Sequence, residues 1–300
     1  MNYHEFLDAV VAYFTEKLGK EYSVSVNEVI KNNNIHLNGI LMKKMGQRIT
    51  PNIYLNPFYE QYLEEENFAV VAEDIWTTYC EALETFQVEE HDFELDFQVQ
   101  KEHIIYRIIN FEKNQWKLKR VPYIRFLDLA ITFHCFVQYQ ENTVSLLPIT
   151  YELMKHWGIS EKFLFQIAME NTQRHFPMIY GSLEEILRTA IEEEEFDVLF
   201  PPMGGNIKMY VVSNQQGVNG ASVMLYEEHF HQLAKQLGGK IYVLPSSIHE
   251  IILVPYDDEI EAEQLAALVK EVNATQVPYE DVLSDHAYLY NSETRSFEVF

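Results

Sequence analysis

The order of strand and helix patterns from residue 207 to the end constrains the fold of this chain most. Short apolar runs bounded by turn residues predict strands, and two stretches with apolar side chains at helical spacing predict helices. The order is strand, strand, helix, strand, strand, helix, followed by two strands that could pair with each other. The predicted strands are Met209–Ser213, Ala221–Leu225, Ile241–Leu244, Glu250–Val254, Ala287–Tyr290 and Ser296–Phe300. This order predicts an α+β module built on an antiparallel sheet.

Before this module, the sequence pattern predicts a helix-rich region that also contains β-hairpins. The first twenty residues carry apolar side chains at helical spacing. Glu21–Ile30 and Ile35–Met45 predict two strands joined by a turn at Asn32–Asn34, because asparagine tolerates left-handed backbone conformations. Helical spacing then returns between Phe58 and Phe86.

In the middle of the chain, the sequence predicts a helix with an aliphatic ridge, then a strand, and then the starts of two further helices. The helix is expected over residues 98–113, and its ridge consists of Ile104, Ile105, Ile108 and Ile109. Phe126–Tyr139 alternates apolar and polar side chains and predicts a strand whose partner ends near Ile149. Ser160 and Ser182 stand where the N-caps of two further helices are expected.

An acidic run followed by Pro and Gly residues separates these two regions. Glu192–Glu195 precedes Phe200–Gly205, a composition that is typical of linkers. The sequence therefore predicts an α+β fold in two parts. These are a helix-rich α+β domain with β-hairpins over residues 1–197 and, after a linker over 198–206, a smaller antiparallel α+β module over 207–300.

The balance of charges limits the partners that this chain can have. It contains 46 Asp and Glu against 22 Lys and Arg, a formal net charge of −24. A general nucleic-acid binder neutralises phosphates with Lys and Arg, so this composition argues against that class of function.

One segment runs against this acidity. Between residues 101 and 125, seven basic side chains face two acidic ones. The segment is the candidate anion-facing surface of the protein, and its candidate binding residues are Lys113, Lys117, Lys119, Arg120 and Arg125. The alternative is a solvated basic loop that pairs internally with acidic surroundings, and the sequence favours this alternative because charge clusters usually serve solubility.

Cysteine usage and hydropathy predict a soluble cytoplasmic protein without a metal or cofactor. Cys80 and Cys135 lie far apart and form neither a CxxC pair nor a zinc-ligand spacing, as expected of reduced thiols. No apolar run approaches the roughly 20 residues that span a bilayer. The glycines form no phosphate-binding loop, and His249-Glu250 lacks the second histidine of HExxH because Leu253 stands in its place.

The densest group of potentially catalytic side chains lies in the C-terminal module. The candidates for a Ser-His-acid relay are Ser246, Ser247, His249, Asp285 and His286. The serines stand in the context LPSSIHE, without the GxSxG glycines that project a nucleophile from a strained turn. The sequence therefore favours a turn between two strands over a hydrolase site.

Three segments resemble one bacterial family. They are IIYRIINFEKNQWKLKRVPYIRFLDLAITF at Ile104–Phe133, YVLPSSIHEIILVP at Tyr242–Pro255 and KEVNATQVPYEDVLSDHAYLY at Lys270–Tyr290. They are similar to domain-of-unknown-function family 5688, and the resemblance extends over nearly the whole chain. It implies a cytoplasmic accessory protein of bacteria and transfers no catalytic residue.

Three functional hypotheses follow from the sequence. The first is a non-enzymatic cytoplasmic protein-interaction or accessory protein whose acidic faces and basic middle segment meet a protein partner. The second is a hydrolase or transferase that uses the Ser, His and Asp residues of the C-terminal module. The third is an acidic DNA mimic, which would need carboxylates in phosphate-like rows on one face.

Overall fold

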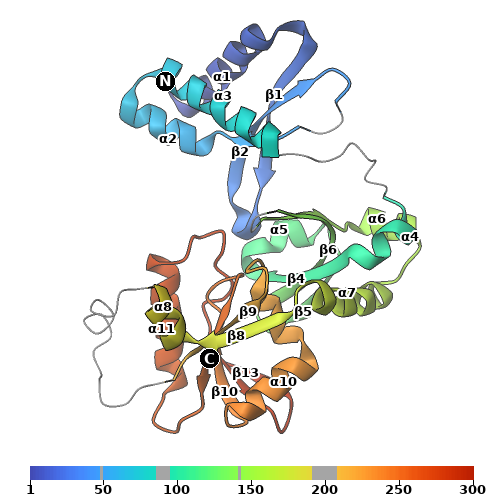
Figure 1. Ribbon diagram of the computed structural model, residues 1–300, viewed down its shortest axis with the longest axis vertical. Helices are drawn as coiled ribbons and strands as arrows, with labels where there is room; N and C mark the ends of the chain where they lie inside the picture. Colours follow the sequence, from blue (N-terminus) through green and yellow to red (C-terminus); the bar gives the residue numbers. More distant parts are fainter. Residues whose placement is uncertain (48–49, 86–94, 141–142, 191–207) are drawn as a thin grey trace. The chain divides into compact units, whose positions relative to one another are not determined.

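The computed structural model describes residues 1–300 except 48–49, 86–94, 141–142 and 191–207 (Figure 1). The chain divides into two units, Met1–Phe93 and Glu94–Phe300. The linker predicted at 198–206 lies outside the described residues, so that boundary stays a prediction. The α+β fold, with helices and a hairpin first and an antiparallel module at the end, is confirmed.

The first unit combines three helices with a three-stranded antiparallel sheet. Its described elements are α1 (Tyr3–Leu18), η1 (Gly19–Glu21), β1 (Tyr22–Ile30), η2 (Asn32–Asn34), β2 (His36–Lys44), β3 (Asn52–Tyr54), α2 (Asn56–Glu65) and α3 (Phe68–Thr85). The predicted first helix and hairpin are confirmed, and Asn33 and Asn34 adopt the expected left-handed φ values of 55° and 60°. A capping box between Asn2 and Glu5 starts α1. The apolar faces of α1 and α3 form one core with β2, in which Phe6, Phe14 and Tyr79 are buried.

The second unit begins with a small sheet whose first strand corrects the sequence prediction. After α4 (Phe97–Gln100), residues Ile104–Asn110 form strand β4 instead of a helix. Neighbouring residues Ile104 and Ile105 are both buried, as are Ile108 and Ile109, because β4 is covered on both faces. Such a strand loses its alternation and imitates helical spacing, while β-branched isoleucine favours the strand.

The other strands of this sheet pair with the long central strand β6. The order is β4–β6–β5, with β7 also on β6, and all pairs are antiparallel. The strands after β4 are β5 (Tyr123–Phe126), β6 (Leu129–Gln140) and β7 (Thr143–Pro148), and the short helix α5 (Gln115–Leu118) precedes them. Helices α6 (Tyr151–Trp157) and α7 (Glu161–His175) follow, and the predicted strand near Phe126–Tyr139 and the Ser160 N-cap are both confirmed.

The remaining described elements are the strands of a six-stranded antiparallel sheet and the helices between them. They are β8 (Met178–Ser182), α8 (Leu183–Ala190), β9 (Tyr210–Asn214), η5 (Gly220–Leu225), α10 (Glu227–Gln236), β10 (Lys240–Leu244), β11 (Ile251–Pro255), α11 (Ala262–Thr275), β12 (Tyr288–Asn291) and β13 (Ser296–Val299). The strand order is β13–β12–β10–β11–β9–β8. Helix α11 packs against Tyr242 and Leu244 on one face, and Phe230 of α10 packs against Tyr290 on the other.

Two features of this sheet differ from the sequence prediction. The strand predicted at Ala221–Leu225 is the 3-10 helix η5, because Gly220 packs so closely on β9 and His249 that the chain turns instead of pairing. The sheet also contains β8, a strand that the sequence analysis did not predict; it ends at Ser182, and the helix predicted to open there is α8, which begins at Leu183. Strand β8 precedes the predicted linker but pairs with β9 after it.

Candidate functional site

The two segments that carry the predicted relay lie side by side. Ser247 forms a β-bridge with Val282, and the Leu283 amide donates a 2.9 Å hydrogen bond to the Ser246 carbonyl. The Ile248 amide donates in the same way to the Asp281 carbonyl at 2.8 Å. The structure therefore brings the serine turn next to the loop that contains Asp285 and His286.

The serine turn is held by its own hydroxyl and by an acid that the sequence analysis missed. Ser247 is buried, and its Oγ accepts a 3.0 Å hydrogen bond from the His249 amide. The His249 ring places Nε2 3.3 Å from Oδ1 of Asp281, not of Asp285. Within the described residues, no hydrogen bond joins either serine of this turn to an imidazole ring. These contacts activate neither serine, and the Ser-His-acid relay stays a prediction.

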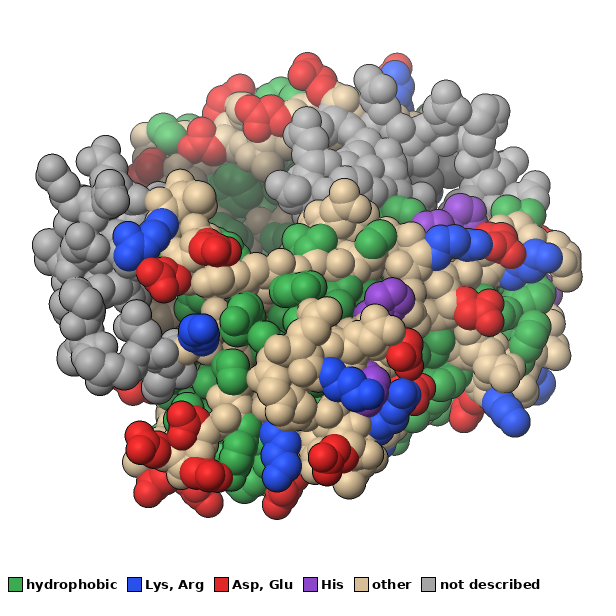
Figure 2. Space-filling view, turned by 60° about the horizontal axis from the view of Figure 1, so that its bottom comes forward, with side chains coloured by type: hydrophobic (Ala, Val, Ile, Leu, Met, Phe, Trp, Pro, Cys, Tyr) green, Lys and Arg blue, Asp and Glu red, His purple; other side chains and the backbone are tan. Residues whose placement is uncertain are grey.

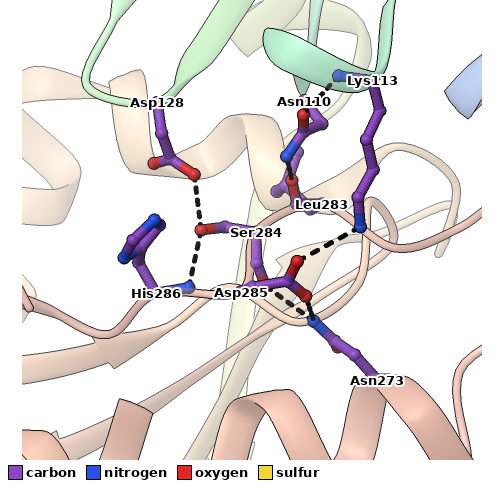
Figure 3. A network of polar contacts seen from close by, with 8 residues as sticks. All are labelled: Asn110, Lys113, Asp128, Asn273, Leu283, Ser284, Asp285 and His286. Carbon is purple, nitrogen blue, oxygen red and sulfur yellow. Dashed lines mark hydrogen bonds and ion pairs between the residues drawn. The ribbon is translucent and has the colours of Figure 1, made fainter.

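The neighbouring loop is fixed by Asp128, which lies in the tight turn between β5 and β6 (Figure 3). Ser284 is fully buried, and its Oγ donates to Oδ2 of Asp128 at 2.7 Å and accepts from the His286 amide at 3.0 Å. Tyr288 donates to the other carboxylate oxygen of Asp128 at 2.5 Å. Burial, together with the adjacent Asp128 carboxylate, raises the pKa of Tyr288 far above its usual value, so this phenol stays protonated as a donor. The hydroxyls of Ser284 and Tyr288 therefore both donate to the Asp128 carboxylate. Nδ1 of His286 lies 3.0 Å from the Phe300 carbonyl oxygen.

Asp285 is neutralised by a basic residue from the predicted binding segment. Its carboxylate lies 3.3 Å from Nζ of Lys113 and accepts a 2.8 Å hydrogen bond from Asn273 (Figure 3). Burial alone would raise the pKa of Asp285, but the Asn273 hydrogen bond and the Lys113 charge outweigh it and lower the pKa. Asn110 adds a 2.9 Å hydrogen bond to the Leu283 carbonyl. We call these contacts the Asp128 network; they tie the loop before β12 to β4 and to the β5–β6 turn.

The other basic candidates separate into exposed and buried groups. Arg120 stacks 4.5 Å from the centre of the Trp116 ring, and Arg125 stacks 3.9 Å from that of Phe111. Lys119 is exposed, whereas Lys117 on α5 is half-buried. Burial, reinforced by the charge of Arg107, lowers the pKa of Lys117 from 10.5 to about 7. The basic run is therefore not one continuous surface.

The described residues contain two free thiols but neither a metal-binding cluster nor a helix that could cross a membrane. Among these residues, no group of three or more His, Cys, Asp and Glu side chains could hold a metal ion. Both cysteines are free thiols, and burial raises the pKa of Cys135 to about 12. Every described helix is too short or too polar to cross a membrane.

A surface that the sequence analysis missed lies along β8. Ile179 and Tyr180 point to opposite faces of the sheet, and their exposed fractions are 49% and 51%. The exposed Ile186 of α8 lies against Gly181, on the same face as Ile179. We call Ile179, Tyr180 and Ile186 the β8 edge patch. Figure 2 shows hydrophobic side chains gathered across the middle of one face, with acidic ones along its lower margin.

Comparisons with known proteins give a family. No curated protein and no solved structure matches the chain. The model of the family described as "Family of unknown function (DUF5688)" matches residues 3–292. This match covers nearly all of the 300 residues and confirms the resemblance drawn from the sequence, so the chain belongs to the DUF5688 family.

Proposed function

We propose that this chain is a cytoplasmic, non-enzymatic protein-interaction protein that binds an extended segment of a partner along β8. The β8 edge patch is the observation that carries the proposal. Strand β8 ends the sheet on its side among the described residues, so the backbone groups that face away from β9 can pair with another strand. Side chains on both faces of β8 are available to hold such a strand.

The two edges of this sheet differ in their protection. Proteins usually place charged side chains on edge strands, and β13 at the opposite edge carries Glu298. Its Phe297 is packed among Phe230 and Tyr290. Strand β8 has the sequence MIYGS, without a charged residue, and exposes apolar side chains instead. This contrast supports β8 as an edge kept open for pairing.

The charge near β8 supports a positively charged partner. Glu184 and Glu185 are exposed in the first turn of α8, which follows β8. Glu184 pairs with Arg188 of the same helix at 3.1 Å, which leaves Glu185 as the excess charge there, and the whole chain carries a net charge of −24. Opposite charges speed association and set specificity at such a surface. We therefore expect an extended segment in which apolar residues alternate with Lys or Arg.

Peptide selection tests the proposal with the full chain. A phage library of random peptides is selected against the immobilised protein, and enriched peptides are measured by fluorescence anisotropy. We expect alternating apolar and basic sequences whose binding is lost in Ile179→Lys. Amide hydrogen exchange should slow across Met178–Ser182 when such a peptide binds.

A matched variant on the other edge gives the control. Val299 of β13 is exposed to a similar degree, and Val299→Lys should bind the same peptides as the wild type. Circular dichroism and thermal unfolding establish that both variants are folded. Selection without enrichment, or equal binding to wild type and Ile179→Lys, would overturn the proposal.

A further inference from the structure

One face of the β4–β6–β5 sheet collects basic side chains. Arg107 of β4 pairs in register with Thr132 of β6, and His134 lies two residues further along β6 on the same face. Helix α5 packs on this face, because Leu118 lies in one apolar cluster with Ile109 and Ala130. Lys117 precedes Leu118 on α5. Burial, followed by the charges of Arg107 and Lys117, lowers the pKa of His134 well below its usual value, so its ring is neutral in the unliganded protein.

Two nitrogen atoms of this group are buried without hydrogen-bond partners. His134 is 3% exposed, and its Nε2 lies 3.1 Å from the Thr132 hydroxyl, but its Nδ1 has no partner in the structure. Nε of Arg107 is equally enclosed and unpaired. Buried polar atoms in folded proteins are nearly always hydrogen-bonded to protein groups or to ordered water, so these two atoms need a partner from outside the chain.

The charges lead to the same conclusion. Burial lowers the pKa of Arg107 to about 10, and no described carboxylate pairs with Arg107 or Lys117. Elsewhere in this unit basic side chains do find acids, as Arg174 does with Glu102 at 2.9 Å. The chain carries a net charge of −24, yet Arg107 and Lys117 lie in a partly enclosed place where none of the described carboxylates pairs with either of them. Such an arrangement is unfavourable unless an anion completes it.

We infer that Arg107, Lys117 and His134 form a binding site for a phosphate group. The planar guanidinium, the ammonium and the imidazole approach from two strands and a helix, and a tetrahedral dianion offers acceptor oxygens in several directions. A planar carboxylate has one charge and two oxygens, so it matches these donors less well. Arg107 and Lys117 are partly exposed, which leaves the group reachable from solvent.

Calorimetric titration of the full chain with inorganic phosphate at constant ionic strength tests this inference. We expect saturable binding that Arg107→Gln and Lys117→Met each weaken by about tenfold or more, as for the loss of one charge-assisted hydrogen bond. Lys119→Met removes an exposed charge of the same segment and should bind like the wild type. Acetate should not compete with phosphate at equal concentration.

Two further ligands identify the source of the phosphate group, and the use of two variants controls for misfolding. Phosphoserine and AMP are titrated beside inorganic phosphate, and the tightest of the three that depends on Arg107 indicates whether free phosphate, a phosphorylated side chain or a nucleotide is bound. Two separate variants are used so that one unfolded protein does not decide the outcome. Absence of saturable binding for all three, or equal affinity in wild type, Arg107→Gln and Lys117→Met, would overturn the inference.

Discussion

The Asp128 carboxylate accepts the hydroxyl of Ser284 at 2.7 Å, across 156 residues of chain. Asp128→Asn removes the negative charge and leaves one carboxylate oxygen position without an acceptor for these buried donors. We expect the free energy of unfolding to fall by about 2 kcal/mol, as for lost hydrogen bonds to a charged group. Urea denaturation measures the change. Asp258→Asn alters an exposed carboxylate that accepts from Tyr256 and should change stability little; equal effects of both substitutions would contradict a structural role for the Asp128 network.

Replacing Ser247 separates a structural turn from a catalytic relay. The buried Ser247 hydroxyl accepts from the His249 amide, so Ser247→Ala should lower the free energy of unfolding by about 1 kcal/mol. A fluorophosphonate probe, which labels activated serines, should leave the wild-type protein unlabelled. Labelling at Ser247 that disappears in Ser247→Ala, or labelling at Ser246, would instead support the hydrolase hypothesis.

Gly220 at the start of η5 packs closely against β9. A Cβ atom there would lie 2.1 Å from Oγ of Ser213 and 2.3 Å from the His249 carbonyl oxygen. Gly220→Ala should therefore lower the free energy of unfolding by about 2 kcal/mol or more. Gly181→Ala is the matched control, because its Cβ would meet only Ile186 at 3.4 Å and should change stability by about 0.5 kcal/mol or less. Similar effects of the two substitutions would show that the packing around Gly220 yields easily.

Lys117 should make stability depend on pH in a recognisable direction. Its pKa is lowered from 10.5 to about 7 in the folded state, so below pH 7 the ammonium is charged in both states and burial destabilises the fold. Between pH 7 and 10.5 the unfolded chain binds more protons, so stability rises with pH. Lys117→Met should stabilise the protein at pH 6 by an amount on the order of 1–3 kcal/mol and remove this part of the rise.

Urea denaturation of wild type and Lys117→Met from pH 6 to 10, without phosphate, measures this difference. Lys119→Met controls for the loss of a surface charge and should follow the wild type. A constant difference between wild type and Lys117→Met across this range would show that the ammonium is solvated.

Cutting the chain within 198–206 tests the predicted division into domains. Strand β8 before this segment pairs with β9 after it, and Tyr226 donates to the Phe176 carbonyl at 2.7 Å. A protease site placed there should yield two fragments that still elute together in gel filtration, because these contacts join them. Fragments that separate without denaturant would support two independent domains.

The sequence predicts elements well where local chemistry and tertiary burial agree. The capped helix α7, the amphipathic α1 and the pair β10–β11 all follow from their own residues. It misleads at Ile104–Asn110, where burial on both faces hides the alternation of a strand. It also misleads at Gly220–Leu225, where the close packing of Gly220 decides the local turn.

The site residues illustrate the same limit. The sequence places Asp285 near His286 and suggests it as the acid of a relay, but His249 faces Asp281 and Asp285 faces Lys113. Which acid meets which base depends on how the loop before β12 crosses the sheet. Asp128 carries no motif, and its role arises only when the β5–β6 turn meets Ser284 and Tyr288.

The position of these partners along the chain has a consequence for synthesis. Ser284 and Tyr288 follow Asp128 by 156 and 160 residues, so the ribosome must add this whole stretch before Asp128 can bind both of them. Strands β12 and β13, which complete the sheet on one side, emerge last. During translation the apolar side chains that β12 covers, such as Phe230, therefore stay exposed until this strand has been made, and the nascent second unit can close only after that point.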